Sequence, residues 1–227
     1  MAEVDDRLRE LFDAEKRART LHDEILRASD DVVTAALEKA ATRALAQKDH
    51  DAAAHELVPI ARLLGEVEGP KAVDLLIDLI ASGSAEARVV AGEMLEAVAF
   101  DRFKEVALGI ERALARLPKG SAALTELPFL LAEVGEPGCV KLLGMFLKLP
   151  DADAVAAAIE ALAELGDPAA VPLLAPLEKD ARQVQLDDED HASERVSIGD
   201  LAYEARELLE EVARAAQGET KDKKKGR

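Results

Sequence analysis

The chain has 227 residues, of which 49% are hydrophobic, 33% are charged and only 3% are aromatic. Its 46 acidic and 29 basic side chains give a net charge of −17, which repels phosphate backbones and argues against DNA or RNA as the main ligand. The single cysteine excludes a disulfide framework and a cysteine-based zinc site, and it indicates a reducing compartment.

The first residues, MAEVDDRLRELF, are acidic where a secretory signal needs a basic and then an apolar stretch. The longest strongly apolar runs, such as Leu75 to Ala81, fall far short of the ~20 residues that cross a bilayer. We therefore expect a cytoplasmic protein that does not contact a membrane. The high content of Ala, Arg and Glu suggests a bacterial source.

Residues 3–28 are predicted to form a long charged helix whose middle, DAEKRART, is polar all round. Its apolar residues gather near the two ends: Val4, Leu8, Leu11, Phe12, Leu21, Ile25 and Leu26. The heptad 4-8-11-15-18-22-25 places Glu15 and His22 in the seam, which makes a poor coiled coil. A cap, a protrusion and a weak dimerisation helix are all compatible with this pattern, and we favour a capping helix over residues 1–30.

An internal repeat occupies residues 60–212. Five predicted helices each carry an apolar triad at positions i, i+4 and i+7, which lie on one side of a helix. The triads are Ile60/Leu64/Val67, Ala91/Leu95/Val98, Leu127/Leu131/Val134, Ala158/Leu162/Leu165 and Ala205/Leu209/Val212. Their last members are 31, 36, 31 and 47 residues apart, so one unit recurs and the last interval contains an insertion.

Another amphipathic helix follows each of the first four triad helices. Three of the intervening turns contain Gly, which can end a helix, and Pro, which can begin the next: Glu68-Gly69-Pro70, Gly135-Glu136-Pro137 and Gly166-Asp167-Pro168. The helix after the second triad starts without Pro, at Asp101. The apolar sides of these helices are Val73/Leu76/Ile80, Val106/Ile110/Leu114, Val140/Leu143/Leu147 and Val171/Leu174/Leu177. Residues 31–48 and 50–67 are expected to form the first helix pair.

No segment combines period-two alternation with β-branched residues, so we predict no strands. The polar segment QVQLDDEDHASER at 183–195 is predicted to be a loop insertion. Its acidic run, Asp187 to Asp190, lacks the spacing of a calcium loop. Residues 217–227 are basic and have no apolar anchor, so we expect a disordered tail after a repeat domain at 31–216.

The repeated units resemble HEAT repeats, in particular the HEAT-like type of phycobilisome lyases. Residues 63–99, LLGEVEGPKAVDLLIDLIASGSAEARVVAGEMLEAVA, and residues 161–177, ALAELGDPAAVPLLAPL, carry the likeness, which extends over about residues 31–215. Arg88 stands where many HEAT units have an arginine. The equivalent positions here are Leu57, Leu124, Val155 and Ala202, so no arginine ladder is expected.

The resemblance implies an all-α fold: a right-handed α-solenoid of about five HEAT-like helix pairs with an extra N-terminal helix. In such arrays each pair contacts its neighbours, and the terminal units need a polar outer side. The charged N-terminal helix and the last helix, EARELLEEVARAAQ, are similar to such caps. The second helix of each pair would line a concave face, which is the usual binding surface of this fold.

Carboxylates recur on the triad helices. Stacking in register would align Glu66, Glu133 and Glu164 in a column. Five further candidate residues would enlarge this acidic surface: Glu93, Glu96, Glu160, Glu207 and Glu211. Glu210 would add to the same patch. An acidic concave face would attract a basic protein partner in a salt-dependent way. The alternative is that these glutamates form an ordinary solvated helix surface.

Other reactive residues give no catalytic pattern. His50 and His55 diverge by about 140° on a helix and cannot chelate one metal, and His22 and His191 stand apart from them. Cys139 lies near a helix start, where the dipole lowers a thiol pKa, but we favour a buried packing residue. There is no GxSxG, GxGxxG or P-loop motif. We predict no catalytic residue, metal or cofactor.

The leading hypothesis is therefore a non-enzymatic HEAT-repeat scaffold or adaptor that binds another protein. The alternative is a bilin lyase-like enzyme or enzyme subunit, although few aromatic or basic residues are present to hold a tetrapyrrole. A HEAT-like DNA glycosylase is disfavoured by the net charge of −17 and the absence of Trp. The sequence leaves the partner, the binding face and the oligomeric state, a monomer included, open.

Overall fold

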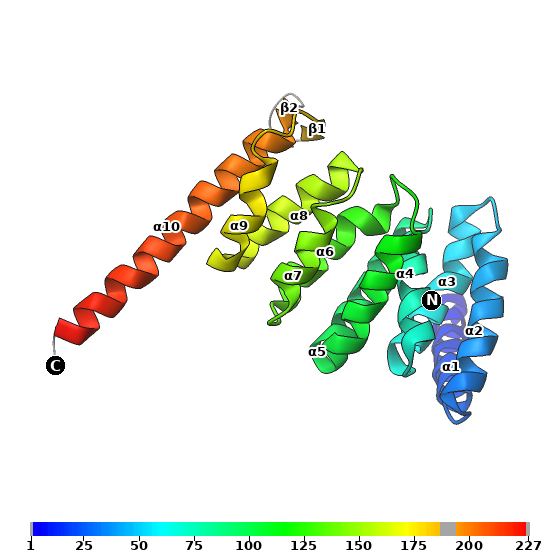
Figure 1. Ribbon diagram of the computed structural model, residues 1–227. Helices are drawn as coiled ribbons and strands as arrows, with labels where there is room; N and C mark the ends of the chain where they lie inside the picture. The colour runs from blue at the N-terminus through cyan, green and yellow to red at the C-terminus, as the bar shows by residue number, and fades with distance from the viewer. Residues whose placement is uncertain (1, 187–193, 226–227) are drawn as a thin grey trace. The chain divides into compact units, whose positions relative to one another are not determined.

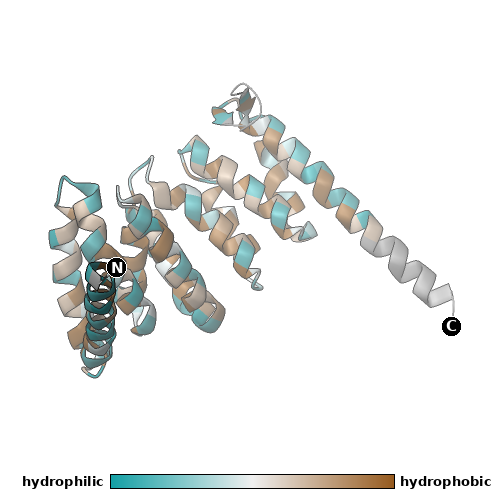
Figure 2. Cartoon of the chain, turned by 180° about the vertical axis from the view of Figure 1, so that it is seen from behind, coloured by the Kyte–Doolittle hydropathy of each residue, from teal (hydrophilic) through white to brown (hydrophobic). Residues whose placement is uncertain are grey.

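The computed structural model describes residues 2–186 and 194–225, which are helical apart from one short hairpin (Figure 1). The prediction of an all-α fold is confirmed. The chain divides into two units, Met1–Gly109 and Ile110–Arg227. Teal and brown alternate along most helices in Figure 2, as expected of helices that bury one apolar side.

The first unit is built from helices of very different exposure. It contains α1 (Ala2–Ile25), α2 (Asp30–Leu45), α3 (His50–Glu66), α4 (Pro70–Ile80) and the first part of α5 (Ala85–Arg116). α2 packs against α3 and α3 packs against α4, with Leu64 and Leu76 fully buried. A Cβ at Gly65 would lie 3.0 Å from the sulfur of Met94, so α3 and α5 approach closely at this glycine.

α1 is the exposed helix of this unit. All its described residues are exposed except His22, which is half-buried. The exposed fraction is between 42% and 61% for its large apolar side chains, which are Val4, Leu8, Leu11, Phe12, Leu21 and Ile25. His22 Nε2 lies 2.6 Å from Glu66 Oε1 on α3. These side chains are not buried against the rest of the chain, and the capping role of residues 1–30 stays a prediction.

The turn between α3 and α4 has the predicted Gly-Pro arrangement. Gly69 has a φ of 116°, which a residue with a side chain adopts only with strain, and Pro70 then begins α4. The backbone N–H of Glu68 donates to Asp30 Oδ2 at 3.2 Å, so the first residue of α2 holds the turn.

α5 is kinked at Arg102, whose φ of −134° and ψ of 48° are not helical. The break falls one residue after Asp101, where a new helix was predicted. The guanidinium of Arg102 donates to Glu105 at 3.1 Å and to the carbonyl oxygen of Val67 at 3.3 Å. Glu105 also accepts the N–H of Gly69 at 2.8 Å, so the kink is tied to the turn between α3 and α4.

The second unit has two helical layers. It contains the last part of α5, α6 (Ala122–Val134), α7 (Cys139–Phe146), α8 (Ala152–Leu165), α9 (Val171–Leu174) and α10 (Ile198–Lys225). α6, α8 and α10 pack side by side in that order (Figure 1). α7 packs against α6 and α8, and α9 packs against α10. Leu131, Phe146 and Leu162 are fully buried in this core.

Glycine ends two helices of the side-by-side layer, as predicted. Gly135 follows α6 with a φ of 62°, and Gly166 follows α8 with a φ of 64°. Both residues adopt the left-handed conformation that ends a helix and that glycine adopts without a steric penalty. The predicted turns after the third and fourth triads are therefore confirmed.

The predicted helix after Gly166 is shorter than expected. α9 spans four residues, and the 3₁₀ turns Pro168–Ala170 and Ala175–Leu177 flank it. Three prolines, Pro168, Pro172 and Pro176, recur every fourth residue. Pro168 can begin a helix, but Pro172 and Pro176 each lack the N–H that an α-helix needs and crowd the preceding turn, so a continuous α-helix cannot form.

The prediction of no strands is wrong, and the described ends of the predicted loop at 183–195 are strands. β1 (Gln183–Leu186) and β2 (Glu194–Ser197) form an antiparallel hairpin in which Val184 pairs with Val196. Four-residue strands are too short to show period-two alternation, but the β-branched Val184 is buried. The acidic run Asp187 to Asp190 and His191 lie outside the described residues.

The helical backbone of α10 extends into the C-terminal segment, and the disorder expected there stays a prediction. The backbone of α10 stays helical to Lys225, across most of the segment 217–227 for which disorder was predicted. Glu, Gln and Lys are good helix formers, and basic residues near a helix C-terminus complement the helix dipole. Local propensity thus extends the helix without an apolar anchor. Residues 226–227 lie outside the described residues.

Replacing Leu131 with alanine is expected to lower the free energy of unfolding by about 2–5 kcal/mol, because the change leaves a cavity in a close-packed core. Leu131 is 0% exposed on α6. Leu208→Ala on α10 is the control, since Leu208 is 49% exposed and its truncation is expected to cost within about 0.5 kcal/mol. Urea denaturation followed by circular dichroism measures both, and equal losses would contradict this packing.

Candidate functional site

The eight predicted site carboxylates divide between the two units. The first unit holds Glu66, Glu93 and Glu96, and the second holds Glu133, Glu160, Glu164, Glu207 and Glu211. All are exposed except Glu96 and Glu207, which are half-buried. The predicted column of Glu66, Glu133 and Glu164 spans both units and stays a prediction.

The side-by-side helices of the second unit each have an outer acidic ridge. Their opposite sides are buried through residues such as Leu127 on α6, Leu162 on α8 and Leu209 on α10. Because α7 and α9 lie on that buried side, the three ridges lie on the same outer side of the layer. We call this surface the acidic face; its carboxylates are Glu126, Glu133, Asp153, Glu160, Glu164, Glu204, Glu207 and Glu211.

Sequence reasoning missed three of these carboxylates. Glu126, Asp153 and Glu204 each stand seven residues before a predicted site residue, Glu133, Glu160 and Glu211 respectively. Seven residues are about two helical turns, so each pair lies on the same side of its helix. The pattern that reveals these three residues is the helical period, because carboxylates recur along one side of each helix just as the apolar residues recur along the other.

Most of the predicted carboxylates on the acidic face are not neutralised. Within the described part of the chain, four of them form no ion pair and no side-chain hydrogen bond: Glu133, Glu160, Glu164 and Glu211. Glu207 differs, because its Oε1 lies 3.4 Å from Arg206 Nη2. Exposed carboxylates without cationic neighbours leave a negative potential that attracts cationic groups.

Two exposed aromatic side chains accompany the carboxylates. Phe129 is 39% exposed on the α6 ridge, and Tyr203 is 50% exposed on α10. The guanidinium carbon of Arg206 lies 5.6 Å from the Tyr203 ring centroid, a cation–π distance. Arg206 also forms ion pairs with Glu178 and Glu210, which raise the pKa of its guanidinium. Exposed aromatics amid polar groups are typical anchors of protein interfaces.

In the first unit one predicted residue is already engaged. The carboxylate of Glu66 is hydrogen-bonded to His22 of α1. The other two predicted residues, Glu93 and Glu96, lie about one turn apart on α5. Glu93 is exposed and Glu96 is half-buried. This unit therefore offers a smaller acidic surface than the acidic face of the second unit.

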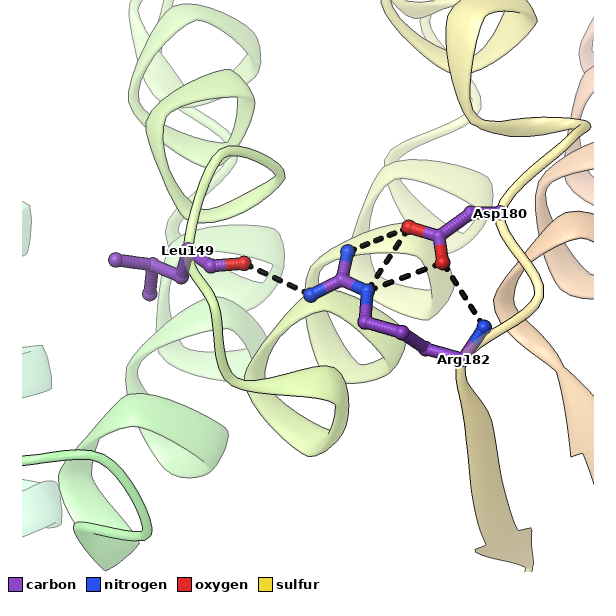
Figure 3. Close-up of polar contacts among 3 residues, drawn as sticks. All are labelled: Leu149, Asp180 and Arg182. Atoms are coloured by element: carbon purple, nitrogen blue, oxygen red, sulfur yellow. Dashed lines mark hydrogen bonds and ion pairs between the residues drawn. The ribbon is translucent and has the colours of Figure 1, made fainter.

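Arg182 joins the segment after α9 to the connector before α8 (Figure 3). Its Nη1 donates to the carbonyl oxygen of Leu149 at 3.0 Å. Its Nε and Nη2 donate to the carboxylate of Asp180 at 3.0 and 2.6 Å. The hydrogen bond from this guanidinium holds the pKa of Asp180 below its ordinary value, because the charged carboxylate is favoured.

Asp151 and the first residues of α10 extend this network. Asp151, which precedes α8, is 3% exposed and accepts the N–H of Gly120 before α6 at 2.6 Å. The N–H groups of Ile198 and Gly199 at the start of α10 donate to the carbonyl oxygens of Arg182 and Asp180, each at 2.9 Å. Hydrogen bonds between connectors thus link the starts of α6, α8 and α10 and set the relative positions of the three ridges.

Cys139 is a packing residue of α7 and is 0% exposed. Burial raises the pKa of its thiol, so the thiol stays protonated and is a poor nucleophile at neutral pH. The expectation of a buried packing residue is confirmed. The helix dipole does not produce a reactive thiol, because loss of water around the sulfur has the larger effect on its pKa.

Among the residues that the structure describes, no group of three or more His, Cys, Asp or Glu side chains is placed to hold a metal ion. His50 begins α3 and His55 lies within it, both outside the buried core. In the same described ranges, no helix has the length and apolarity needed to cross a membrane.

Comparison with known proteins assigns no family to the chain. No protein-family model matches it, and no curated protein matches it at a significant level. Among solved structures it is similar to an engineered protein, with 20% identity over 87% of this chain and 90% of the other, and a TM-score of 0.35. Similarity of this strength carries no argument about function.

Replacing Asp180 with asparagine is expected to lower the free energy of unfolding by about 1–2 kcal/mol near neutral pH, because Arg182 loses its charged acceptor. The pKa of Asp180 in the folded protein is below its ordinary value of 3.8, so its contribution is present above that value. It is lost as the pH falls through the lower folded pKa. Urea titrations at several pH values measure the difference between the two proteins.

The stability difference should shrink as the pH falls well below 3.8, the ordinary pKa of this carboxyl. Asp153→Asn on the exposed ridge of α8 is the matched control, because Asp153 forms no ion pair among the described residues. A difference between wild type and Asp180→Asn that is unchanged in acid would contradict the contribution of this ion pair.

Proposed function

We propose that this protein is a non-enzymatic scaffold or adaptor built from HEAT-like repeats, which binds a protein partner with a basic surface through the acidic face. The observation that carries the proposal is the set of un-neutralised carboxylates on three helices that pack side by side, with Phe129 and Tyr203 exposed beside them. A rigid charged surface with aromatic anchors is sufficient for binding, without a reacting group.

The proposed architecture is a right-handed α-solenoid of about five HEAT-like helix pairs. Its support is the recurrence of the apolar triads and the left-handed glycines at equivalent positions after α6 and α8. In this assignment α6, α8 and α10 are the second helices of their pairs, which line the concave face of such arrays. The acidic face would then be part of the concave binding surface.

The charge pattern defines the kind of partner. Basic side chains on a helix, a peptide or a folded domain would neutralise the carboxylates that form no ion pair in the described part of this chain. The attraction would speed encounter and weaken with salt, because exposed charges are screened over about 10 Å at 0.1 M ionic strength. The aromatic rings would supply short-range apolar contact, which salt screens little. A buried free thiol suits the reducing cytoplasm that the sequence predicts.

The double variant Glu133→Lys/Glu164→Lys is expected to weaken partner binding by about tenfold or more, or about 1.4 kcal/mol, without unfolding the chain. Both residues are exposed and have no ion pair in the described structure, so the reversals break no internal contact. Affinity purification from a lysate of the source organism identifies the partner. Titration calorimetry at low and high salt then measures both proteins.

Glu111→Lys/Glu136→Lys is the matched control, because it makes the same change in net charge at exposed positions of the second unit outside the acidic face. The control is expected to keep most of the affinity. Equal binding by wild type and the Glu133/Glu164 variant would place the binding surface elsewhere. Equal losses in both double variants would indicate a response to net charge alone.

A further inference from the structure

We propose that α1 is a self-association helix, through which two copies of this chain pair in antiparallel orientation. The seam consists of apolar and small residues of α1: Val4, Leu11, Ala14, Ala18 and Leu21. This surface is separate from the acidic face of the second unit and does not depend on the proposed scaffold function.

The large apolar side chains of α1 have no cover in the single chain. Val4, Leu11 and Leu21 are 61%, 52% and 52% exposed. Each leaves apolar surface in water that a second helix would remove, and burial of such surface is the main driving force of association. Charged residues on the remaining sides keep α1 soluble while this stripe stays apolar.

The contact with α3 decides which heptad register is free. The frame considered from sequence placed Glu15 and His22 in the seam, but His22 is directed to Glu66 of the same chain. Shifting the frame gives positions 4, 7, 11, 14, 18, 21 and 25, whose spacings alternate between three and four. In this frame Arg7 is the one charged seam residue, and its guanidinium extends to the edge of the seam, where Nη1 donates to Glu10 Oε2 of the same helix at 2.8 Å.

The charge distribution along α1 favours the antiparallel orientation. Residues 3–15 contain six acidic and two basic side chains, a net charge of −4. The second half of the helix, residues 16–25, contains three basic and two acidic side chains, a net charge of +1. Parallel pairing would place like-charged halves together, whereas antiparallel pairing places each half beside the opposite charge.

One register packs the apolar residues together and places opposite charges beside each other at the middle of the helix. Setting Leu11 against the other copy's Ala14 places a large side chain opposite a small one and brings Val4 opposite Leu21. The same register places Glu10, at the edge of the seam, beside Arg17 of the other copy. Both contacts occur twice because the pair is two-fold symmetric. The second helix then ends beside His22, before the first helix joins its own α2.

A lipid surface is a poorer occupant of this helix. Membrane-bound amphipathic helices carry Lys and Arg on their polar side and are attracted to anionic headgroups. α1 instead carries eight acidic residues against five basic ones between residues 3 and 25. The net charge of −17 on the whole chain also opposes an anionic membrane.

Sedimentation velocity of the full chain over about 1–200 µM tests the proposal, because self-association depends on concentration. We expect conversion from the mass of one chain, 24.3 kDa, to twice that mass. Leu11→Lys is expected to hold the protein at the single-chain mass. Thr20→Lys makes the same charge change on the opposite side of α1 and is expected to leave the dimer intact.

The charge contact gives a second and sharper test. Glu10→Arg and Arg17→Glu are each expected to raise the dimer dissociation constant by about tenfold, because each creates two like-charged contacts. An equimolar mixture of the two variants should recover the wild-type constant, since the two substituted side chains then carry opposite charges and meet across the seam. Parallel pairing would not give this recovery, because the two positions would not meet.

A wild-type chain that stays at the single-chain mass throughout the series overturns the proposal. A dimer that survives Leu11→Lys also overturns it, since the dimer contact would then lie elsewhere. Circular dichroism of every variant checks that α1 remains helical. A dimer that is lost with Leu11→Lys but is not restored by mixing the charge variants overturns the antiparallel register.

Discussion

From α2 onward, burial of one apolar side of each helix against neighbouring helices of the chain is the constraint on which this structure depends. The core is aliphatic, and alanine contributes many of its buried positions, such as Ala158 and Ala161 on α8. Small side chains allow α6, α8 and α10 to pack side by side while α7 and α9 cover their inner side. The outer sides of these helices are exposed to solvent, and they carry many of the chain's acidic side chains.

Hydrogen bonds between connectors complement this packing. Apolar contacts are not directional and would tolerate sliding of one helix along another. Asp151 and Arg182 reach to neighbouring connectors, and in the first unit Glu105 does the same at the turn after α3. These hydrogen bonds are directional, and part of the network is buried, so they fix where each helix starts. The positions of the outer carboxylates follow from those starts.

Two surfaces with different chemistry result. The acidic face suits an electrostatic partner, since six of its eight carboxylates form no ion pair in the described part of the chain and two aromatic rings lie beside them. α1 suits a second copy of itself, because its exposed stripe is apolar and its two halves carry opposite charge. A self-associating scaffold would present two acidic faces, which strengthens binding to any partner with repeated basic sites.

Helix positions, glycine turns and the break near Arg102 were predictable from sequence, because apolar periodicity and Gly-Pro chemistry act within a few residues. The short helix at α9 was open to the same reasoning, since its three prolines are visible, whereas the hairpin at 183–197 was too short to give a periodic signal. The positions of the missed carboxylates can be derived from the helical period once the exposed side of each helix is known. These carboxylates are Glu126, Asp153 and Glu204. Contacts between distant segments decide which side of a helix is exposed. They also decide that Cys139 is buried and which side of α1 is available for the proposed seam. Local residue order specifies helices through propensity and spacing, but surfaces arise only when those helices bury one another.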